Sequence, residues 1–278
     1  MSKPDFGPPP RTDFEVVPTA SEVTFFQENG FLAVERLTSD EEIAWLRAIF
    51  EHIFDAENAK AQGAPVDRSG AKRGEASRLA QAFFPEIQFP DILKTSFHRN
   101  AKRFAAALLG APESELTCWG HMIRKPAGGR SAPWHQDHAY WQPEFDYFAL
   151  GVWLPMHDVT VEMGAMQFIP GSHKRGLLRH RHAERPETNI LEVDEAFDIA
   201  SAVPCPLKAG GATFHHSETL HYTAPNATAT PRLAFPMEFQ KRPVRREVPA
   251  SMPWVDEKRA VIGDPPTMYV HDGKVEAL

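Results

Sequence analysis

The feature that most constrains this chain is a succession of short apolar segments between residues 115 and 240. Proline, glycine and asparagine separate the segments, and several of them alternate apolar with polar residues, as half-buried strands do. Many short strands at this spacing favour a sandwich or barrel over an alternating strand–helix fold. We therefore predict a mainly β protein with a double-stranded β-helix core, that is, a cupin-like jelly roll. The segments are LTCWGHMIRK, APWHQDHAYW, FALGVWLPM, AMQFIP, GATFHH, TLHYTA and RLAFPMEF.

The part of the chain before these segments has a helical pattern. TSDEEIAWLRAIFEHIFDA combines a capping Ser39 with acidic residues in its first turn and apolar residues at helical spacing. FHRNAKRFAAALLG is typical of a second helix that ends at Gly110, and SEVTFFQENG of a shorter one that ends at Gly30. Residues 56–78 are polar and aperiodic, so we predict a loop there.

The helices and the strand-rich part are predicted to form one domain, because no linker-like composition separates them. This domain spans residues 20–278, and the polar, proline-rich residues 1–19 form a flexible tail. Within it, a helix-rich support over residues 20–114 lies against a jelly-roll core over residues 115–240. Residues 241–278 have little periodicity and are predicted to form an extended C-terminal wrap.

Composition argues against several kinds of partner. The chain has 30 basic and 37 acidic residues and a net charge of −7, which gives no general attraction to nucleic acid or to an anionic membrane. Its most apolar short stretch, FAAALLGA, is far below the roughly 18–20 residues of a membrane span. The N-terminus lacks the apolar region of a secretory signal, and two cysteines are too few for a disulfide framework. We expect a cytoplasmic protein that acts on a small molecule; the sequence leaves its oligomeric state open.

The stretch PWHQDHAYW contains three side chains that can bind a metal, His135, Asp137 and His138. In a strand, His135 and Asp137 would point to one face and His138 to the other. In a helix, His135 and His138 would share a face instead. Pro133 and the neighbouring aromatic residues favour the strand, so His135 and Asp137 are predicted to be the pair.

A third ligand must come from elsewhere in the chain. An iron(II) centre for oxygen chemistry typically uses two histidines and one carboxylate, which leaves three positions open. The stretch FHHSETLHYTAPN supplies His215, His216 and His221. Strand alternation alone does not choose between them, because a turn can interrupt residues 216–220.

Several motifs together resemble the phytanoyl-CoA dioxygenase family of iron(II)- and 2-oxoglutarate-dependent oxygenases. They are WHQD, then GAMQFIPGSHKRG, then LHYTAPN followed by PR, and an opening FFQENGFLAVERLTSDEEIAWLR. The resemblance covers about residues 22 to 240. It implies a jelly-roll fold, and iron ligated by the catalytic residues His135, Asp137 and His221. His216 matches a position before the distal histidine that is not a ligand.

The resemblance also implies a 2-oxoglutarate site. Arg232, eleven positions after His221, would pair with the cosubstrate carboxylate that does not chelate iron, since arginine offers a planar fork matched to a carboxylate. Thr223 shares a strand face with His221 and could donate its hydroxyl to the same carboxylate. His121 and Lys125 fall where the family has cosubstrate or substrate contacts.

Another cosubstrate candidate lies in the strand FALGVWLPM. Ala149, Gly151 and Trp153 share one face of it, and two small residues beside a large aromatic suggest a face kept open for a ligand. Trp153 also matches a family position that contacts 2-oxoglutarate.

The reaction implied by the resemblance uses Fe(II), 2-oxoglutarate and O₂, with ascorbate for reactivation, and releases succinate and CO₂. Hydroxylation of an unactivated C–H bond is favoured over halogenation, because related halogenases lack the carboxylate supplied here by Asp137. Desaturation, epimerisation and ring chemistry use the same ligands and stay open. The side chains of Trp134, Tyr140 and His216 are candidates for substrate contact.

Two other functions remain open at this point. Two histidines and one aspartate can also hold zinc and activate water, as in a metal-dependent hydrolase on a cupin-like barrel. Such a hydrolase has no need of Arg232. The same fold could also serve as a non-catalytic binder of small molecules, although a binder has no need of an open metal face.

Overall fold

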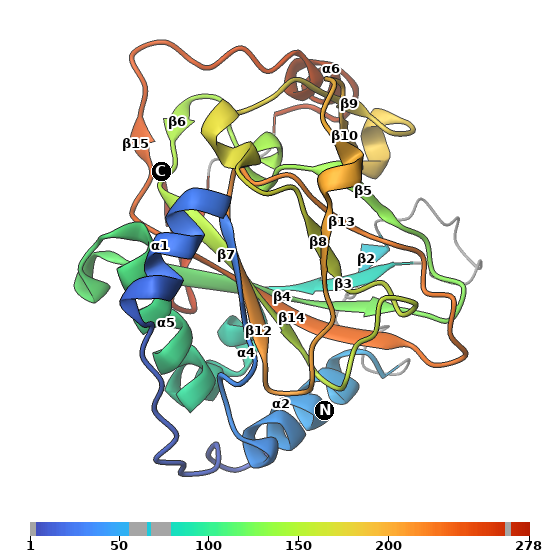
Figure 1. The fold of residues 1–278 in the computed structure, drawn as a ribbon. Helices are drawn as coiled ribbons and strands as arrows, with labels where there is room; N and C mark the ends of the chain where they lie inside the picture. The colour runs from blue at the N-terminus through green and yellow to red at the C-terminus, as the bar shows by residue number, and fades with distance from the viewer. Residues whose placement is uncertain (1–3, 56–65, 68–78, 265–267) are drawn as a thin grey trace.

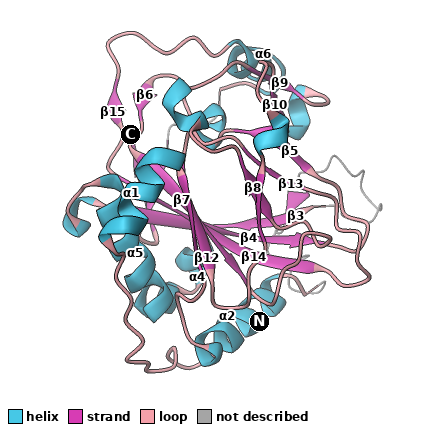
Figure 2. Ribbon diagram, viewed as in Figure 1, coloured by secondary structure: helices cyan, strands magenta, loops and turns pink. Residues whose placement is uncertain are grey.

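The computed structural model describes residues 4–55, 66–67, 79–264 and 268–278, and these are mainly strands and loops with a few helices (Figures 1 and 2). The predicted loop at 56–78 lies outside the described residues except for 66–67. The helices are α1 (Ala20–Asn29), α2 (Asp40–Ile53), α4 (Pro85–Gln88), α5 (Ser96–Leu109) and α6 (Pro253–Ile262). The strands are β1 (Phe31–Val34), β2 (Val66–Asp67), β3 (Ala80–Phe83), β4 (Thr117–Lys125), β5 (Ala132–His135), β6 (Phe145–Asp146), β7 (Ala149–Pro155), β8 (Met166–Phe168), β9 (His180–His182), β10 (Leu191–Val193), β11 (Val203–Cys205), β12 (Ala212–His216), β13 (His221–Thr223), β14 (Arg232–Gln240), β15 (Val244–Arg245), β16 (Met268–His271) and β17 (Lys274–Ala277).

Two antiparallel sheets form the centre of the molecule. The larger has seven strands in the order β1-β12-β7-β14-β4-β3-β2, and the smaller has four in the order β11-β8-β13-β5. The smaller sheet faces the larger one on the side opposite α1, α2 and α5 (Figure 1). This arrangement confirms the predicted mainly β jelly roll, although the two central sheets stay separate among the described residues and do not close into a continuous barrel.

Strand alternation divides the core into two layers. On β7, the side chains of Leu150, Val152 and Leu154 pack in the apolar cluster between the larger sheet and the helices. Trp153 packs in the apolar cluster between the two sheets. On β14 the odd-numbered residues from 233 to 239 face the helices in the same way, and Ala234 faces the smaller sheet. The even-numbered face of β14 therefore points into the space where the sheets meet.

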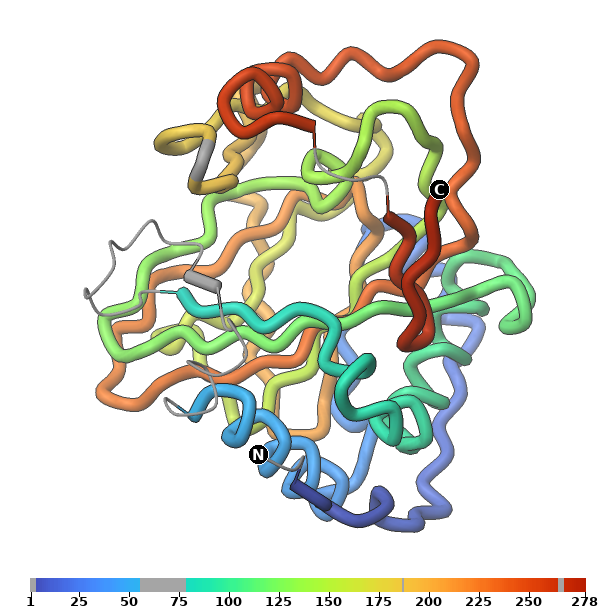
Figure 3. The backbone as a smooth tube through the Cα atoms, turned by 180° about the vertical axis from the view of Figure 1, so that it is seen from behind, coloured from blue at the N-terminus to red at the C-terminus, as the bar shows by residue number. Residues whose placement is uncertain are grey.

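The first and last described segments pack on the rest of the domain. Residues 4–19 lie against α2 and α5, since the Trp45 indole donates to the Phe6 carbonyl (3.1 Å) and the Asn100 amide to the Phe14 carbonyl (3.0 Å). The predicted C-terminal wrap contains α6 and the hairpin β16–β17. The hairpin is the dark red segment at the C-terminus in Figure 3, which shows the molecule from behind. No helix in the described part of the chain is both long and apolar enough to cross a membrane.

A buried carboxylate joins the two long helices of the support. Glu42 on α2 is 1% exposed, and it accepts hydrogen bonds from the backbone N–H groups of Ser96 (2.6 Å) and Phe97 (3.0 Å). These N–H groups belong to the first turn of α5, where a helix attracts negative charge. The Thr38 hydroxyl donates to the same carboxylate.

We predict that Glu42→Ala lowers the free energy of unfolding by about 3 kcal/mol, because it leaves buried donors without an acceptor. Urea denaturation followed by circular dichroism measures this change. The control is Glu41→Ala at the exposed neighbouring position, which should stay within about 0.5 kcal/mol of the parent. Equal midpoints for the two variants would contradict this role of Glu42.

Candidate metal centre

The predicted metal ligands converge at the edge of the smaller sheet. His135 ends β5 and pairs directly with His221, the first residue of β13, so that their rings lie 4.1 Å apart. The Asp137 Oδ1 atom is 3.9 Å from His135 Nε2 and 3.4 Å from His221 Nε2. These three residues, the triad from here on, each offer one ligand atom within 4.8 Å of the others, which is close enough for a single cation.

Asp137 lies in a turn and not in the strand that the sequence predicted. The strand stops at His135, and Asp137 begins a 3₁₀ turn over Asp137–Tyr140. The premise of a strand through residues 133–141 was therefore wrong, although His135 and Asp137 do lie together. His138 is buried and points away, with its Nδ1 atom 3.0 Å from Glu218 Oε1.

Hydrogen bonds fix the tautomer of both triad histidines. The Nδ1 atoms of His135 and His221 lie 2.6 Å and 2.9 Å from the backbone carbonyls of Pro133 and Thr219. A carbonyl only accepts, so Nδ1 carries a proton in both rings and Nε2 is the atom that faces Asp137. Burial opposes it, but Asp137 raises the pKa of His221, so a metal would displace a proton from that Nε2. Burial, with a contribution from the nearby His221, lowers the pKa of His135 to about 3, so His135 is a neutral ligand at physiological pH.

Two further residues hold the Asp137 carboxylate. His215 on β12 is buried, and its Nε2 atom lies 2.8 Å from Asp137 Oδ2, the oxygen that does not face the triad histidines. Glu238 comes from β14, which lies on the other side of β7 from His215. Burial raises the pKa of Glu238 well above its usual value and the charge of Asp137 adds to this, so its protonated carboxyl donates to Asp137. Burial alone would raise the pKa of Asp137, but His221 and the hydrogen bond from His215 keep it well below its usual value.

Gly151 makes room for these two residues. A Cβ atom there would lie 2.6 Å from the His215 ring and 3.2 Å from Glu238 Oε1. The small residue on β7 was predicted to keep the face open for a ligand, but it accommodates His215. Sequence reasoning listed His215 only as a possible ligand and missed Glu238. The signal for Glu238 was a single acidic residue within the otherwise apolar segment RLAFPMEF.

Two buried basic side chains, called the cation pair from here on because both would be charged next to an anion, lie beside the triad. Arg232 and Lys125 are directly paired across β14 and β4, and they are 2% and 0% exposed. Lys125 Nζ donates to Thr223 Oγ1 (2.8 Å) and to the Ala224 carbonyl (2.7 Å). Burial lowers the pKa of Lys125 to about 5 with a contribution from Arg232, and burial lowers the pKa of Arg232 to about 10.

The Arg232 guanidinium is oriented by two contacts. Its Nη1 donates to the Gly164 carbonyl (2.6 Å), and its carbon atom lies 5.2 Å from the centre of the Trp153 ring. Within the described residues, neither Arg232 nor Lys125 forms an ion pair with a carboxylate. Thr223 follows His221 on the same face of β13, so it links this cation pair to the triad.

The remaining sequence candidates occupy different surroundings. His121 lies on the same face of β4 as Lys125, but its ring stacks between Phe83 (5.4 Å) and Trp119 (5.7 Å). Trp134 stacks on Tyr222 (5.2 Å) and packs in an apolar cluster on the far side of the smaller sheet; its contact with a substrate stays a prediction. His216 follows His215, so its side chain points away from Asp137, and its Nδ1 accepts from the Glu218 N–H (3.1 Å).

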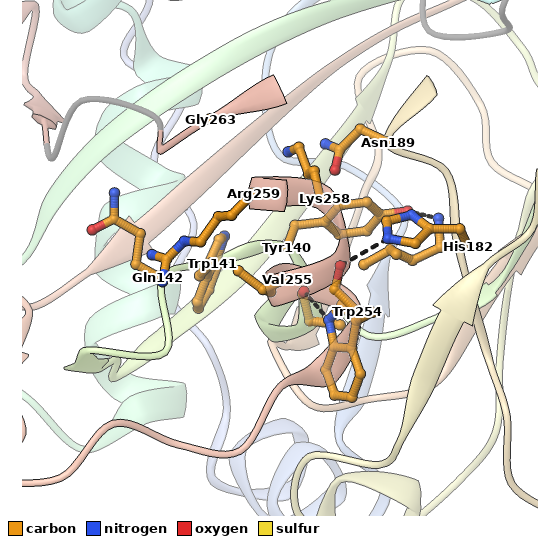
Figure 4. A pocket seen from close by; sticks show the side chains of 12 residues that line it. Tyr140, Trp141, Gln142, His182, Asn189, Trp254, Val255, Lys258, Arg259 and Gly263 are labelled. Atoms are coloured by element: carbon orange, nitrogen blue, oxygen red, sulfur yellow. Dashed lines mark hydrogen bonds between the residues drawn. The ribbon is translucent and has the colours of Figure 1, made fainter. Parts of the chain in front are cut away.

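Tyr140 is the substrate candidate that lies beside the triad. Its ring meets that of His135 edge to face at 5.6 Å, and its hydroxyl accepts from the Leu191 N–H at 3.1 Å. It also lines a partly open pocket between the 3₁₀ turn and α6, together with Trp141, Gln142, His182, Trp254 and Arg259 (Figure 4). No triad residue lines this pocket, so Tyr140 is the residue that borders both the pocket and His135.

The fold and the triad define the class of non-haem iron, 2-oxoglutarate-dependent oxygenases. A family model described as Phytanoyl-CoA dioxygenase (PhyH) matches residues 26–234. The chain belongs to this family.

Individual relatives agree with this assignment. Phytanoyl-CoA dioxygenase domain-containing protein 1 of Mus musculus is 30% identical over 125 residues, which are 44% of this chain and 43% of the mouse protein. The match thus spans less than half of that relative. The crystal structure of EvdO2 from Micromonospora carbonacea var. aurantiaca complexed with 2-oxoglutarate is similar with a TM-score of 0.74 and 33% identity, over 87% of this chain and 99% of that one. The epimerase SnoN, in complex with Fe3+, alpha ketoglutarate and nogalamycin RO, shares the fold at 22% identity, with a TM-score of 0.63 over 81% of this chain and 85% of SnoN.

We predict that His215→Ala weakens Fe(II) binding about 10- to 100-fold, because it removes the group that orients the Asp137 carboxylate. Anaerobic calorimetry with Fe(II) measures the affinity. The adjacent His216→Ala is a matched control and should bind Fe(II) as the parent does, since its side chain lies on the opposite face. Equal affinities for the two variants would contradict the positioning role of His215.

Proposed function

We propose that this chain is an Fe(II)- and 2-oxoglutarate-dependent dioxygenase that hydroxylates an unactivated C–H bond of a small molecule. The observation that carries the proposal is the buried cation pair Lys125–Arg232, joined to the triad through Thr223. Bound iron and 2-oxoglutarate would supply the activation of O₂ for this reaction, with release of succinate and CO₂.

The triad fits iron(II). Two imidazole nitrogens and one carboxylate oxygen are the ligands of the facial arrangement that non-haem iron oxygenases use, and they leave three positions for other molecules. The hydrogen bond between His215 and Asp137 Oδ2 favours binding through Oδ1 alone, because Oδ2 is already engaged. His135, Asp137 and His221 would therefore hold the metal and keep its open side clear.

The cation pair fits the distal carboxylate of 2-oxoglutarate. Without an anion, burial lowers the pKa of Lys125 to about 5 and makes it neutral, and it leaves the charged Arg232 without an ion-pair partner. Two basic side chains buried side by side therefore favour a ligand with negative charge. A dicarboxylate that chelates the metal at one end would offer its second carboxylate to Arg232, and Lys125 and Thr223 could donate to it as well. Trp153 holds the guanidinium in a fixed plane, which suits bidentate pairing with a carboxylate. The similarity to EvdO2, whose structure was solved with 2-oxoglutarate, supports the same ligand here.

Asp137 favours hydroxylation among the possible outcomes. A halogenase needs the aspartate's coordination position for a halide, and here His215 and Glu238 both hold the carboxylate in that position. The aromatic and polar lining of the pocket beside Tyr140 suits a small organic substrate. A hydrolase that uses the same triad would need neither Arg232 nor Lys125, so this alternative leaves the cation pair unexplained.

We predict that Arg232→Ala raises the KM for 2-oxoglutarate about 10- to 100-fold, as expected for loss of a charge-assisted pair, and leaves Fe(II) affinity unchanged. Succinate formation with Fe(II), ascorbate and O₂ measures the KM. Arg242→Ala, at an arginine that pairs with Glu276 on the surface, should leave it unchanged.

Two results would contradict this function. Equal loss of Fe(II) and 2-oxoglutarate affinity in Arg232→Ala would remove the assigned role of Arg232. Activity with zinc and without O₂, together with no succinate from any member of a substrate panel, would favour the hydrolase.

A further inference from the structure

A second cluster of metal-binding side chains lies away from the triad, on the helix-facing side of the larger sheet. His98 comes from α5, Cys118 from β4, and Asp272 from the turn between β16 and β17. The Cys118 sulfur is 3.3 Å from His98 Nε2 and 3.5 Å from Asp272 Oδ1. Each residue offers one ligand atom within 4.8 Å of the other two.

The spacing of these atoms is the spacing around a tetrahedral metal ion. Zinc binds thiolate sulfur at about 2.3 Å and imidazole nitrogen or carboxylate oxygen at about 2.0–2.2 Å, so neighbouring ligand atoms lie roughly 3.5 Å apart. Cys118 is 1% exposed, whereas His98 and Asp272 are half-buried. An ion could therefore enter from solvent, and water could complete its coordination.

Hydrogen bonds within the cluster do not satisfy all of its groups. Burial lowers the pKa of His98 to about 4, so the ring is neutral and has a single N–H, which the Leu93 carbonyl accepts. Nε2 then presents a lone pair to the sulfur. Asp272 also presents an acceptor there, and one S–H group cannot donate fully to both.

The charge around the cluster favours a cation. Glu86 is fully buried nearby, where its Oε1 accepts from the Gly120 N–H (3.2 Å) and its Oε2 has no hydrogen-bond partner among the described residues. Neither Glu86 nor Asp272 forms a salt bridge within that part of the chain. Two carboxyl groups and a thiol thus share a poorly solvated region, on which Lys102 also acts with a positive charge. A divalent ion would balance the carboxylate of Asp272 and the thiolate that forms on binding.

We propose that His98, Cys118 and Asp272 form a second metal site, which binds a thiophilic divalent cation such as Zn²⁺ and fastens the β16–β17 hairpin to the core. On binding, the thiol releases its proton to solvent and the sulfur ligates the ion as a thiolate. The hairpin has two strands only and the side chains of β17 are exposed, so it needs an anchor. The hairpin already has two links to β4. The Asp272 N–H donates to the Cys118 carbonyl (2.7 Å) and Asp272 Oδ1 accepts from the Cys118 N–H (3.0 Å), and the hydroxyl of the buried Tyr269 is hydrogen-bonded to Thr117, so the ion would add a third link.

Cobalt(II) distinguishes this site from the triad, because only this site contains a thiolate. Titration of the metal-free full chain with Co²⁺ should produce a near-ultraviolet sulfur-to-cobalt charge-transfer band that saturates at an equimolar ratio and disappears when Zn²⁺ is added. The band should be absent from Cys118→Ser. It should persist in Cys205→Ser, the matched control at the other buried cysteine, and in His221→Ala, which disables the triad.

Absence of the band in the parent chain, or its persistence in Cys118→Ser, would overturn the proposal. Asp272→Asn provides a second variant if Cys118→Ser fails to fold, because its side chain can still accept from the Cys118 N–H. In Asp272→Asn the band should need at least tenfold more Co²⁺ to reach half saturation. An unchanged titration would show that Asp272 only docks the hairpin.

Discussion

The position of the Asp137 carboxylate is the constraint on which the rest of the centre depends. One oxygen faces the two triad histidines, and the other is held by His215 at 2.8 Å, with Glu238 as a further donor. Asp137 itself lies in a short 3₁₀ turn just after β5, so the backbone alone does not fix its side chain. His215 and Glu238 come from β12 and β14 of the opposite sheet, and their hydrogen bonds join the two sheets at the metal centre.

The strand β14 connects the two functional parts of the site. Its even-numbered face carries Arg232 at one end and Glu238 toward the other, so one strand contributes both to the anion pocket and to the support of Asp137. All nine of its residues are buried, so a charged side chain on this strand carries a desolvation cost. The two ends of the strand meet this cost in different ways. Glu238 becomes neutral, because Asp137 and burial both favour its protonated form. Arg232 keeps its charge, because its pKa of about 10 is still above physiological pH.

Much of the fold was predictable, because short alternating segments and helix caps are local signals. The jelly roll is confirmed, as are the two long helices, and alternation correctly put Ala149, Gly151 and Trp153 on one face of β7. The α6 helix was missed, since ten residues with a single buried side chain, Trp254, leave a weak periodic pattern. Of the site, the structure brings the triad, Arg232, Lys125 and Thr223 together as the motifs suggested. The support by His215 and Glu238 depends on the register between distant strands, which one sequence does not reveal.

The central claim is that one metal-bound 2-oxoglutarate bridges the triad and the cation pair. Anaerobic visible spectroscopy of the Fe(II) protein tests it most directly, because a 2-oxo acid that chelates iron(II) through its keto and carboxylate oxygens gives a charge-transfer absorption. The account predicts a broad visible band on addition of 2-oxoglutarate, which saturates at an equimolar ratio and needs far more 2-oxoglutarate in Arg232→Ala. Full Fe(II) binding without any 2-oxoglutarate-dependent band would contradict it.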